Sequence, residues 1–326
     1  MHHPLPYAAV WPTFGDVIDN SADSAAVVMA CHSELRWNSI VNAIASLHEQ
    51  TRIPDQIIVT VDHNVALAER LRSQFRDLTV VLNESGSRGA SGNRNCGANA
   101  ATASLIAFLD DDEVAAPDWL ERLIEPFGGE AVVGTGGRSI AAWAATRPVW
   151  FPPEFAWTVG AHYRGMPTRP TVVRNVWAGS MVVRAEVFRR VGGFRADFGK
   201  VGDRSQPEDT DLCIRMAAAV PGGHWVYVPA AIIHHEVPAE RGTFGFFVRR
   251  CYSEGHGKVL LRRSVSAVSA GALSDEASYL RTTVPNGARI ELRQGLRSLS
   301  RIGAMVVGVT AAGLGAAVAT LNAARH

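Results

Sequence analysis

The feature that most constrains this chain is an alternation of apolar runs with amphipathic runs from Ala25 to about Pro238. Short apolar runs such as "AAVVMAC" and "SLIAFLD" predict buried strands, and "NSIVNAIASLHEQ" places its apolar residues on one helical face. Repeated strand and helix units predict a parallel sheet with helices on both faces. Such folds bind ligands outside the carboxyl ends of their strands, so polar residues at those ends are candidates for a functional site.

The charge balance and the cysteines limit the class of protein. Thirty-two Lys and Arg residues oppose 31 Asp and Glu residues, and no basic tract of the kind that grips nucleic acid is present. We therefore expect no nucleic-acid partner. The four cysteines are scattered singly, which is typical of a reducing compartment and indicates neither a disulfide scaffold nor a zinc site. Residues 1–24 lack the pattern of a signal peptide, so we expect a cytosolic catalytic part.

The C-terminal run from Ile302 to Ala324 contains no charged residue. About 20 such residues suffice to span a bilayer. Four arginines upstream form a basic flank that would stay on the cytoplasmic side: Arg289, Arg293, Arg297 and Arg301. The run is rich in Ala and Gly, however, and this composition also suits close packing against another helix. Both interpretations stay open here, namely a helix that anchors the protein to the plasma membrane and a soluble packing helix.

Three consecutive carboxylates, Asp110, Asp111 and Asp112, follow the apolar run "SLIAFL". At an effective dielectric near 20, like charges about 4 Å apart repel by roughly 4 kcal/mol, so the triplet suggests a bound cation. Mg²⁺ typically binds through one or two carboxylates together with substrate phosphates. If strand alternation continues, Asp110 and Asp112 point to one side and Asp111 to the other. Asp110 and Asp112 are therefore the predicted metal ligands.

Seven short motifs occur in order along the chain: "VVMACHSE", "SLHEQTRIPDQIIVTVD", "RGASGNRNCGANAA", "LIAFLDDDEVAAPDWLERL", "AGSMVVRAEVFRRVGGF", "PEDTDLCIRM" and "VYVPAAIIHH". With them the chain resembles the family 2 glycosyltransferases over about residues 25–240. The resemblance implies the α/β GT-A fold, a Rossmann-like, mostly parallel sheet flanked by helices, with a C-terminal helical extension. Residues 1–24 would be an N-terminal extension, 25–240 the catalytic domain, 241–300 a helical extension and 301–326 a hydrophobic helix.

The activity that the resemblance implies is inverting, metal-dependent sugar transfer. The donor would be UDP-sugar or another nucleotide sugar, the acceptor a hydroxyl of a glycan or of a lipid-linked or cell-envelope molecule, and the cofactor Mn²⁺ or Mg²⁺. Two other classes stay open. A sugar-phosphate nucleotidyltransferase would carry a Gly-rich, Lys-containing loop after its first strand, and "ACHSELRW" has none. The third class is a non-catalytic sugar-binding protein with the same fold.

The resemblance also assigns the catalytic and metal-binding residues. Its ED motif supplies the general base, which here is Asp209, with Glu208 as the alternative. Asp211 is expected to cap the helix that follows. A histidine at the end of a late strand completes the metal site with Asp110 and Asp112, and this role falls to His235. Adjacent strand residues face opposite ways, so His234 would face away. An imidazole ligand favours Mn²⁺ over Mg²⁺.

The donor-binding residues that the resemblance implies are His32, Glu34, Asp62, Arg94, Asp110 and Asp111. The Asp62 carboxylate can accept a hydrogen bond from the imide N–H of uracil, and a simple turn residue is the alternative. Arg94 lies near a helix N-terminus, which suits anionic groups, and a surface ion pair is the alternative. Asp111 would orient the loop or contact ribose.

Two further groups of residues are assigned to the substrates. Three cations would neutralise the leaving diphosphate, since guanidinium groups bind phosphates in a bidentate manner: Arg249, Arg250 and Lys258. Three tryptophans would line the acceptor subsite: Trp150, Trp157 and Trp177. A solvated basic face and ordinary core packing are the respective alternatives.

Overall fold

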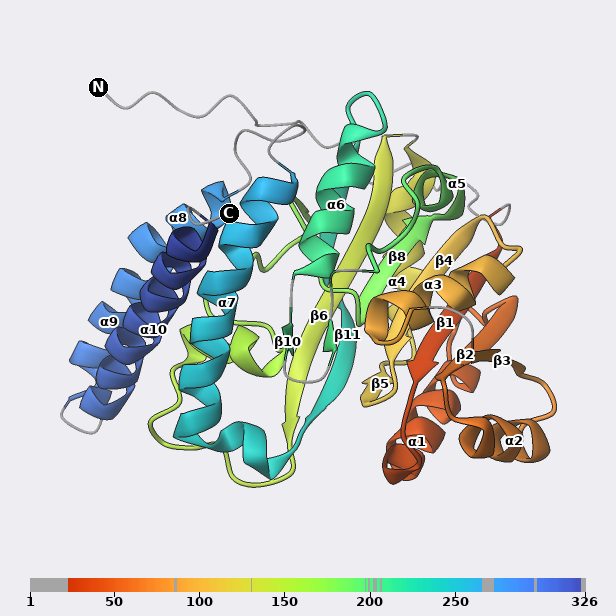
Figure 1. Ribbon diagram of the computed structural model, residues 1–326, viewed down its shortest axis with the longest axis horizontal. Helices are drawn as coiled ribbons and strands as arrows, with labels where there is room; N and C mark the ends of the chain where they lie inside the picture. The colour runs from red at the N-terminus through yellow and green to blue at the C-terminus, as the bar shows by residue number, and fades with distance from the viewer. Residues whose placement is uncertain are drawn as a thin grey trace.

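The structure is a computed structural model, and it describes residues 23–84, 87–129, 131–196, 198, 200–201, 204–205, 207–265, 273–295 and 298–323. Residues 1–22 of the predicted N-terminal extension lie outside the described residues. Figure 1 shows one large twisted sheet with helices on both faces and a group of helices beyond one end of it. The chain thus has the α/β architecture with a C-terminal helical extension that its sequence predicts.

The large sheet has the strand order β3-β2-β1-β4-β8-β6-β11-β5, and β7 also pairs with β11. The strands are β1 (Ala25–Cys31), β2 (Gln56–Asp62), β3 (Thr79–Asn83), β4 (Leu105–Asp110), β5 (Glu113–Ala115), β6 (Val132–Trp143), β7 (Thr171–Val173), β8 (Ser180–Arg184) and β11 (His224–Val237). A separate short pair consists of β9 (Lys200–Val201) and β10 (Arg204–Ser205).

The sheet is mixed, so the prediction of a mostly parallel sheet is wrong for its second half. Strands β3, β2, β1 and β4 run parallel, and β6 is parallel to β11. Strand β8 is antiparallel to both of its neighbours, and β5 and β7 are antiparallel to β11. Apolar periodicity reports that a segment is a strand and which face is buried. It carries no information on the direction in which the strand enters the sheet.

The helices are α1 (Trp37–His48), α2 (Val65–Gln74), α3 (Ala90–Ala100), α4 (Trp119–Ile124), α5 (Ala185–Arg190), α6 (Glu208–Ala218), α7 (Phe244–Ser264), α8 (Ser274–Ser278), α9 (Val284–Arg293) and α10 (Leu299–Ala323). Short helical turns precede α1 (η2, Glu34–Arg36), follow β6 (η4, Pro153–Val159) and precede α9 (η6, Tyr279–Thr283).

Alternate residues of β1 enter two different cores. Val27 and Met29 pack in a cluster with apolar residues of α1, α2 and α4, whereas Ala26 and Val28 pack in a cluster with residues of α3, α5 and α6. This division follows from the alternation of side chains along a strand. Because both faces of the sheet are buried, its strands are continuous apolar runs, and polar side chains are left to the strand ends.

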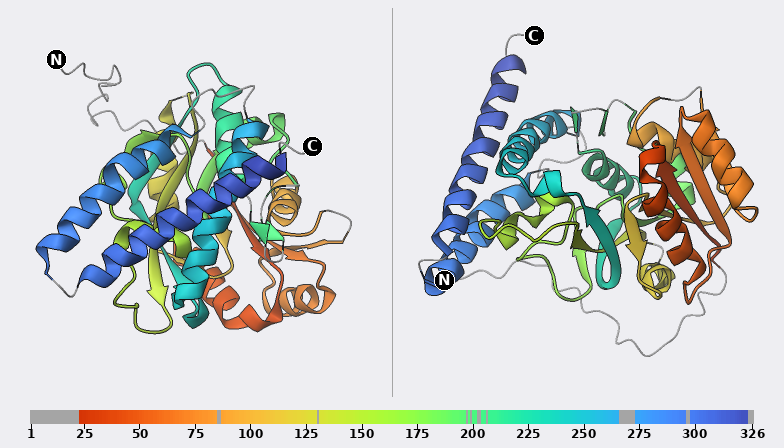
Figure 2. Two further views of the ribbon diagram at one scale, coloured as in Figure 1. Left: turned by 60° about the vertical axis from the view of Figure 1, so that its left-hand side comes forward. Right: turned by 90° about the horizontal axis from the view of Figure 1, so that it is seen from below.

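A third core joins the loop after β6 to the C-terminal helices. Phe151 and Phe155 pack there with Phe247 of α7 and with Ala304 and Met305 of α10. Figures 1 and 2 show α7, α9 and α10 side by side at the end of the sheet. The segments 241–300 and 301–326, predicted as separate units, therefore share a core with the catalytic part in the residues described.

Close contacts between glycines and backbone fix α10 against α7. A Cβ atom on Gly255 of α7 would lie 1.9 Å from the carbonyl oxygen of Ala312, and one on Gly315 would lie 2.0 Å from that of Tyr252. No side chain fits in such a gap, so the two backbones touch. Leu299–Asn322 is also long and apolar enough to cross a membrane, with 33% of its most apolar window buried against the protein.

We predict that Gly255→Ala destabilises the fold by about 1 to 3 kcal/mol, because the added methyl group overpacks the contact between α7 and α10. Thermal or urea unfolding of the full chain measures this change. The matched control is Gly313→Ala, since a Cβ atom there has no neighbour within 4 Å. The Gly313→Ala variant should be as stable as the wild type or more stable by up to about 1 kcal/mol, as expected for a change of Gly to Ala at an exposed helix position. Equal stability of the two variants would refute the contact.

Candidate active site

The carboxyl ends of β1, β2 and β4 meet at one edge of the sheet, as predicted. The Asp62 carboxylate ends β2 and accepts hydrogen bonds from the backbone N–H of Gly89 at 2.9 Å and from Nδ2 of Asn83 at 3.3 Å. Gly89 has a φ of 97° and immediately precedes α3. Asp62 therefore fixes the loop that leads into α3, which is more than the role of a simple turn residue.

The Asp110–Asp112 triplet is neutralised by two arginines. Strand β4 ends at Asp110, and the next two residues form a turn, so strand alternation stops there. Arg94 Nη2 lies 2.5 Å from Asp110 Oδ1, while Arg36 Nη1 lies 2.5 Å from Asp111 Oδ1 and 3.1 Å from Asp112 Oδ2. The expectation that Asp111 faces away from Asp112 is wrong, because one guanidinium reaches both.

The two aspartates beside Arg36 differ in their affinity for protons. Burial raises the pKa of Asp111 to about 7, although the charge of Arg36 opposes the shift. Burial also works against ionisation of Asp112, but the neighbouring imidazole of His235 and guanidinium of Arg36 outweigh it. The pKa of Asp112 is consequently held below its ordinary value. Of these two carboxylates, Asp112 therefore has the stronger tendency to stay ionised.

His235 is the histidine that faces the triplet. Its Nε2 lies 3.7 Å from Asp112 Oδ2 and 3.4 Å from Arg241 Nη1, and its side chain is buried, whereas His234 is exposed. Nδ1 of His235 is buried without a hydrogen-bond partner in the described part of the chain. Gly160 provides the space for the ring, since a Cβ atom there would lie 2.9 Å from Cε1. The strand alternation predicted for the two histidines is therefore correct.

The predicted metal ligands are only partly assembled. Asp112 and His235 are adjacent, but Asp110 is turned toward Arg94. Within the described residues, no three His, Cys, Asp or Glu side chains meet in an arrangement ready for a metal ion. The donor types nevertheless fit a divalent cation, because carboxylates and imidazole are ligands of Mn²⁺.

Glu113 is a site residue that the sequence reasoning missed. Its buried Oε2 accepts the backbone N–H of Asp110 at 3.0 Å, and burial together with the charges of Asp110 and Asp112 raises its pKa well above the ordinary value. The carboxyl group lies against Gly179, where a Cβ atom would be 2.5 Å from Oε1. The fourth acidic residue of "DDDE" and the glycine of "AGS" were the available signals.

Arg94 connects the triplet to the second acidic motif. Its side chain is 7% exposed, and its Nη1 lies 3.3 Å from Oε1 of Glu208, the first residue of α6. Burial and the charge of Asp209 raise the pKa of Glu208 to about 7 even though Arg94 opposes the shift. Burial raises the pKa of Asp209 as well. One guanidinium thus holds the ends of β4 and α6 in a single site.

The neighbours of Glu208 in the sequence have different environments. Asp209 Oδ1 accepts the backbone N–H of Thr210 at 2.6 Å, which orients the carboxylate in the first turn of α6. Asp211 does not cap the helix as predicted, because α6 already begins at Glu208. It is fully buried and pairs with Arg215 at 2.7 Å, so its role is structural.

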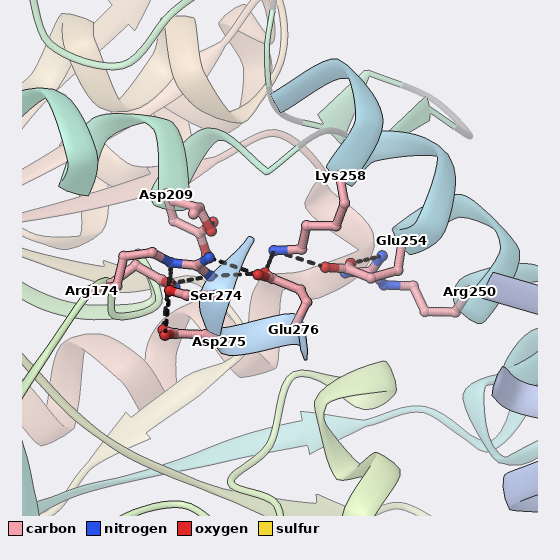
Figure 3. A network of polar contacts seen from close by, with 10 residues as sticks. Arg174, Asp209, Arg250, Glu254, Lys258, Ser274, Asp275 and Glu276 are labelled. Carbon is pink, nitrogen blue, oxygen red and sulfur yellow. Dashed lines mark hydrogen bonds and ion pairs between the residues drawn. The ribbon is translucent and has the colours of Figure 1, made fainter. Parts of the chain in front are cut away.

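Two of the three cations predicted to bind the diphosphate are engaged with carboxylates. Lys258 lies 3.2 Å from Glu254 and 3.0 Å from Glu276, and Arg250 lies 2.9 Å from Glu254. Arg249 is exposed on the same helix. Figure 3 shows this network beside Asp209. The alternative of a merely solvated basic face is therefore wrong for Lys258 and Arg250.

Helix α8 contributes two further acidic residues to that network, Asp275 and Glu276. Glu276 forms two hydrogen bonds with the guanidinium of Arg174, at 2.7 and 2.8 Å, and Asp275 lies 3.5 Å from it. Burial works against ionisation of Glu276, but Arg174 and Lys258 outweigh it and lower its pKa to about 2. The Glu276 carboxylate stays charged at neutral pH and holds Arg174 and Lys258 beside Asp209 (Figure 3).

The remaining predicted contacts lie at the surface or in the third core. His32 and Glu34 are exposed after β1. Trp150 and Trp157 are half-buried and pack against the third core, where the ring of Trp150 meets Phe247 and that of Trp157 meets Phe155. Trp177 is half-buried between β7 and β8. Trp150 and Trp157 thus both contact aromatic residues of the third core.

Comparison with known proteins identifies relatives. A family model described as glycosyl transferase family 2 matches residues 26–192. Over 259 residues the chain is 31% identical to the glucosyl-dolichyl phosphate glucuronosyltransferase of Haloferax volcanii, and the match covers 78% of this chain and 81% of that relative. It is 30% identical to the succinoglycan biosynthesis protein ExoM of Rhizobium meliloti, covering 56% of this chain and 58% of that relative.

Two solved structures share the fold. The mannosyltransferase PcManGT from Pyrobaculum calidifontis, in complex with GDP-Man and Mn²⁺, has a TM-score of 0.56 at 15% identity and covers 90% of this chain and 87% of its own. GalNAc-T7 with UDP, GalNAc and Mn²⁺ has a TM-score of 0.52 at 16% identity and covers 79% of this chain and 53% of its own. These similarities confirm the predicted GT-A fold.

We predict that Arg94→Gln destabilises the chain by about 3 kcal/mol, because it leaves the half-buried carboxylates of Glu208 and Asp110 without their cation. Chemical unfolding measures the change. The double variant Arg94→Gln with Glu208→Gln should recover part of the loss. The control Arg122→Gln removes an exposed pair with Asp118 and should change stability by no more than about 0.5 kcal/mol. A wild-type unfolding curve for Arg94→Gln would contradict the bridging role.

The raised pKa of Glu208 predicts a pH-dependent stability difference. The folded chain holds the proton more tightly than the unfolded chain, so the stability contributed by Glu208 is lost as pH rises through about 7. The Glu208→Gln variant has no proton to lose at this position. The free energy of unfolding of the variant minus that of the wild type should therefore be larger at about pH 8 than at about pH 5. Unfolding at both pH values tests this. Glu121→Gln, on the exposed side of α4, should follow the wild type at both.

Proposed function

Since this chain belongs to glycosyltransferase family 2 and has the GT-A fold, we propose that it transfers a sugar from a nucleotide-sugar donor to a hydroxyl of a lipid-linked or cell-envelope acceptor, with inversion at the anomeric carbon. The observation that carries the proposal is the bridge made by Arg94 between Asp110 and Glu208. It brings a donor-side carboxylate cluster and an acceptor-side pair of carboxylates into one site.

The names of the relatives support the classes of substrate. The Haloferax volcanii relative is named for a glucosyl-dolichyl phosphate, which is a lipid-linked sugar. The Pyrobaculum calidifontis structure contains GDP-Man, and the GalNAc-T7 structure contains UDP. We infer a nucleotide-sugar donor and a lipid-linked acceptor for this chain. Because the chain belongs to a glycosyltransferase family, the alternative function of a sugar-phosphate nucleotidyltransferase has less support than sugar transfer.

Asp110, Asp112 and His235 would hold a divalent cation, which we propose to be Mn²⁺ or Mg²⁺. Asp112 and His235 already lie 3.7 Å apart, and the low pKa of Asp112 keeps it charged. Both related structures contain Mn²⁺. When bound, the cation supplies positive charge that offsets the charge developing on the departing diphosphate. Asp62 and Arg94 are proposed to bind the base and the phosphates of the donor.

The catalytic step assigned to this chain is removal of a proton. The acceptor hydroxyl oxygen forms a bond to the anomeric carbon while the bond from that carbon to the diphosphate oxygen breaks, and the hydroxyl proton passes to Asp209. The raised pKa of Asp209 suits a base that must accept a proton near neutral pH. Since no covalent intermediate forms, one displacement inverts the configuration. Glu208 is the alternative base, held by Arg94.

We predict that Asp209→Asn lowers kcat by about 10²- to 10⁴-fold, as expected for loss of a general base. The measurement is sugar transfer from a panel of nucleotide sugars with Mn²⁺ and Mg²⁺, with the configuration of the product read by NMR. Asp118→Asn, an exposed residue of a surface ion pair, is the control and should retain wild-type kcat. Full activity of Asp209→Asn with loss in Glu208→Gln would move the role to Glu208, and retention of configuration would exclude the mechanism.

A further inference from the structure

Helix α10 has two faces of opposite environment. The face toward the protein buries Ala304, Met305, Gly308, Ala311, Gly315 and Ala319. The opposite face exposes large apolar side chains, with Val306 61%, Leu314 59% and Leu321 63% exposed. At about 3.6 residues per turn these two sets fall on opposite sides of the helix. From Ile302 to Ala323 the outward face carries no charge.

The middle of α10 packs against a turn of α7 that carries charged residues. Gly255 of α7, which touches the backbone of Ala312, stands between Glu254 and Lys258 of the ion network. A bilayer that crossed α10 around Ala312 would therefore surround this network with hydrocarbon. Charged groups at that depth are strongly disfavoured. A position in which the helix lies parallel to the bilayer surface leaves the network in water.

The charges near this face fit an anionic surface. From Tyr279 to His326 the sequence contains one acidic residue, Glu291, and it is fully buried between Arg164 and Arg301. The helix beside α10, together with the turn before it, exposes Arg281, Arg289 and Arg293. Figure 2 shows α9 and α10 running side by side at the edge of the molecule. Exposed apolar and basic side chains together are typical of interfacial membrane helices.

We propose that α10 is a membrane-docking helix that lies in the plane of an anionic lipid surface, with Val306, Leu314 and Leu321 inserted and the arginines of α9 at the headgroups. The inference concerns the way in which the chain meets the membrane and is independent of donor and acceptor. It differs from a spanning helix in that both ends of α10 stay on one side. It differs from a packing helix in that the outward face contacts lipid.

Binding of the purified full-length chain to vesicles, measured by flotation without any substrate, tests the proposal. We expect stronger binding to vesicles of phosphatidylcholine with phosphatidylglycerol than to phosphatidylcholine alone. Leu314→Glu should weaken binding about tenfold or more. Arg289→Gln and Arg293→Gln should each weaken binding to the anionic vesicles about fivefold. The matched control Ile53→Glu alters a residue that is 71% exposed between α1 and β2, and it should bind as the wild type does.

Three results would overturn the proposal. The first is equal vesicle binding by Leu314→Glu and the wild type. The second is a lipid-free dimer that Leu314→Glu dissociates, which would make the face an interface between two copies. The third is labelling of Asn322→Cys and Gln294→Cys from opposite sides of a cell membrane by an impermeant maleimide, which would show a spanning helix. Because none of these readouts requires turnover, failure of the docking proposal is distinguishable from failure of the proposed reaction.

Discussion

The ion pairs of Arg94 are the contact on which the arrangement of the site depends. The guanidinium is almost completely buried, and it meets Asp110 at the end of β4 and Glu208 at the start of α6. These two carboxylates are separated by nearly a hundred residues and sit on different elements. Removing one charge from such a buried set leaves the others without compensation, which is far more costly than breaking a surface pair. The ion pairs of Arg94 thereby hold the N-terminus of α6 against the sheet.

In this structure, two arginines therefore neutralise the triplet in the way that a bound metal ion would. Arg94 neutralises Asp110, and Arg36 neutralises Asp111 and Asp112. The repulsion that suggests a metal from the sequence is already offset by protein charges. Assembly of the proposed metal site thus requires an exchange of partners at Asp110. In the proposed function such an exchange would also alter the contact with Glu208, because the same guanidinium holds both carboxylates.

Much of the site was predictable because parallel strands bring their carboxyl ends together. Asp62 and Asp110 could each be placed at a strand end from the local pattern, and the structure locates them there, whereas β11 continues past His235 to Val237. Arg36 could not, because its contacts with Asp111 and Asp112 form only after folding. The direction of β8 and the acidic contacts of α8 were also unpredictable, since apolar periodicity encodes burial and not partners. The packing of Trp150 and Trp157 was unpredictable for the same reason, because the core that they contact is completed by α7 and α10.

The backbone contact between Gly255 and Ala312 has a practical consequence for work with this enzyme. The turn of α7 that touches α10 is the same turn that presents Glu254 and Lys258 to the network beside Asp209 (Figure 3). The apolar helix is therefore a structural support of the acidic and basic groups beside Asp209. A version of the chain shortened to improve its solubility would lose that support, so an inactive truncate would say nothing about the need for a membrane.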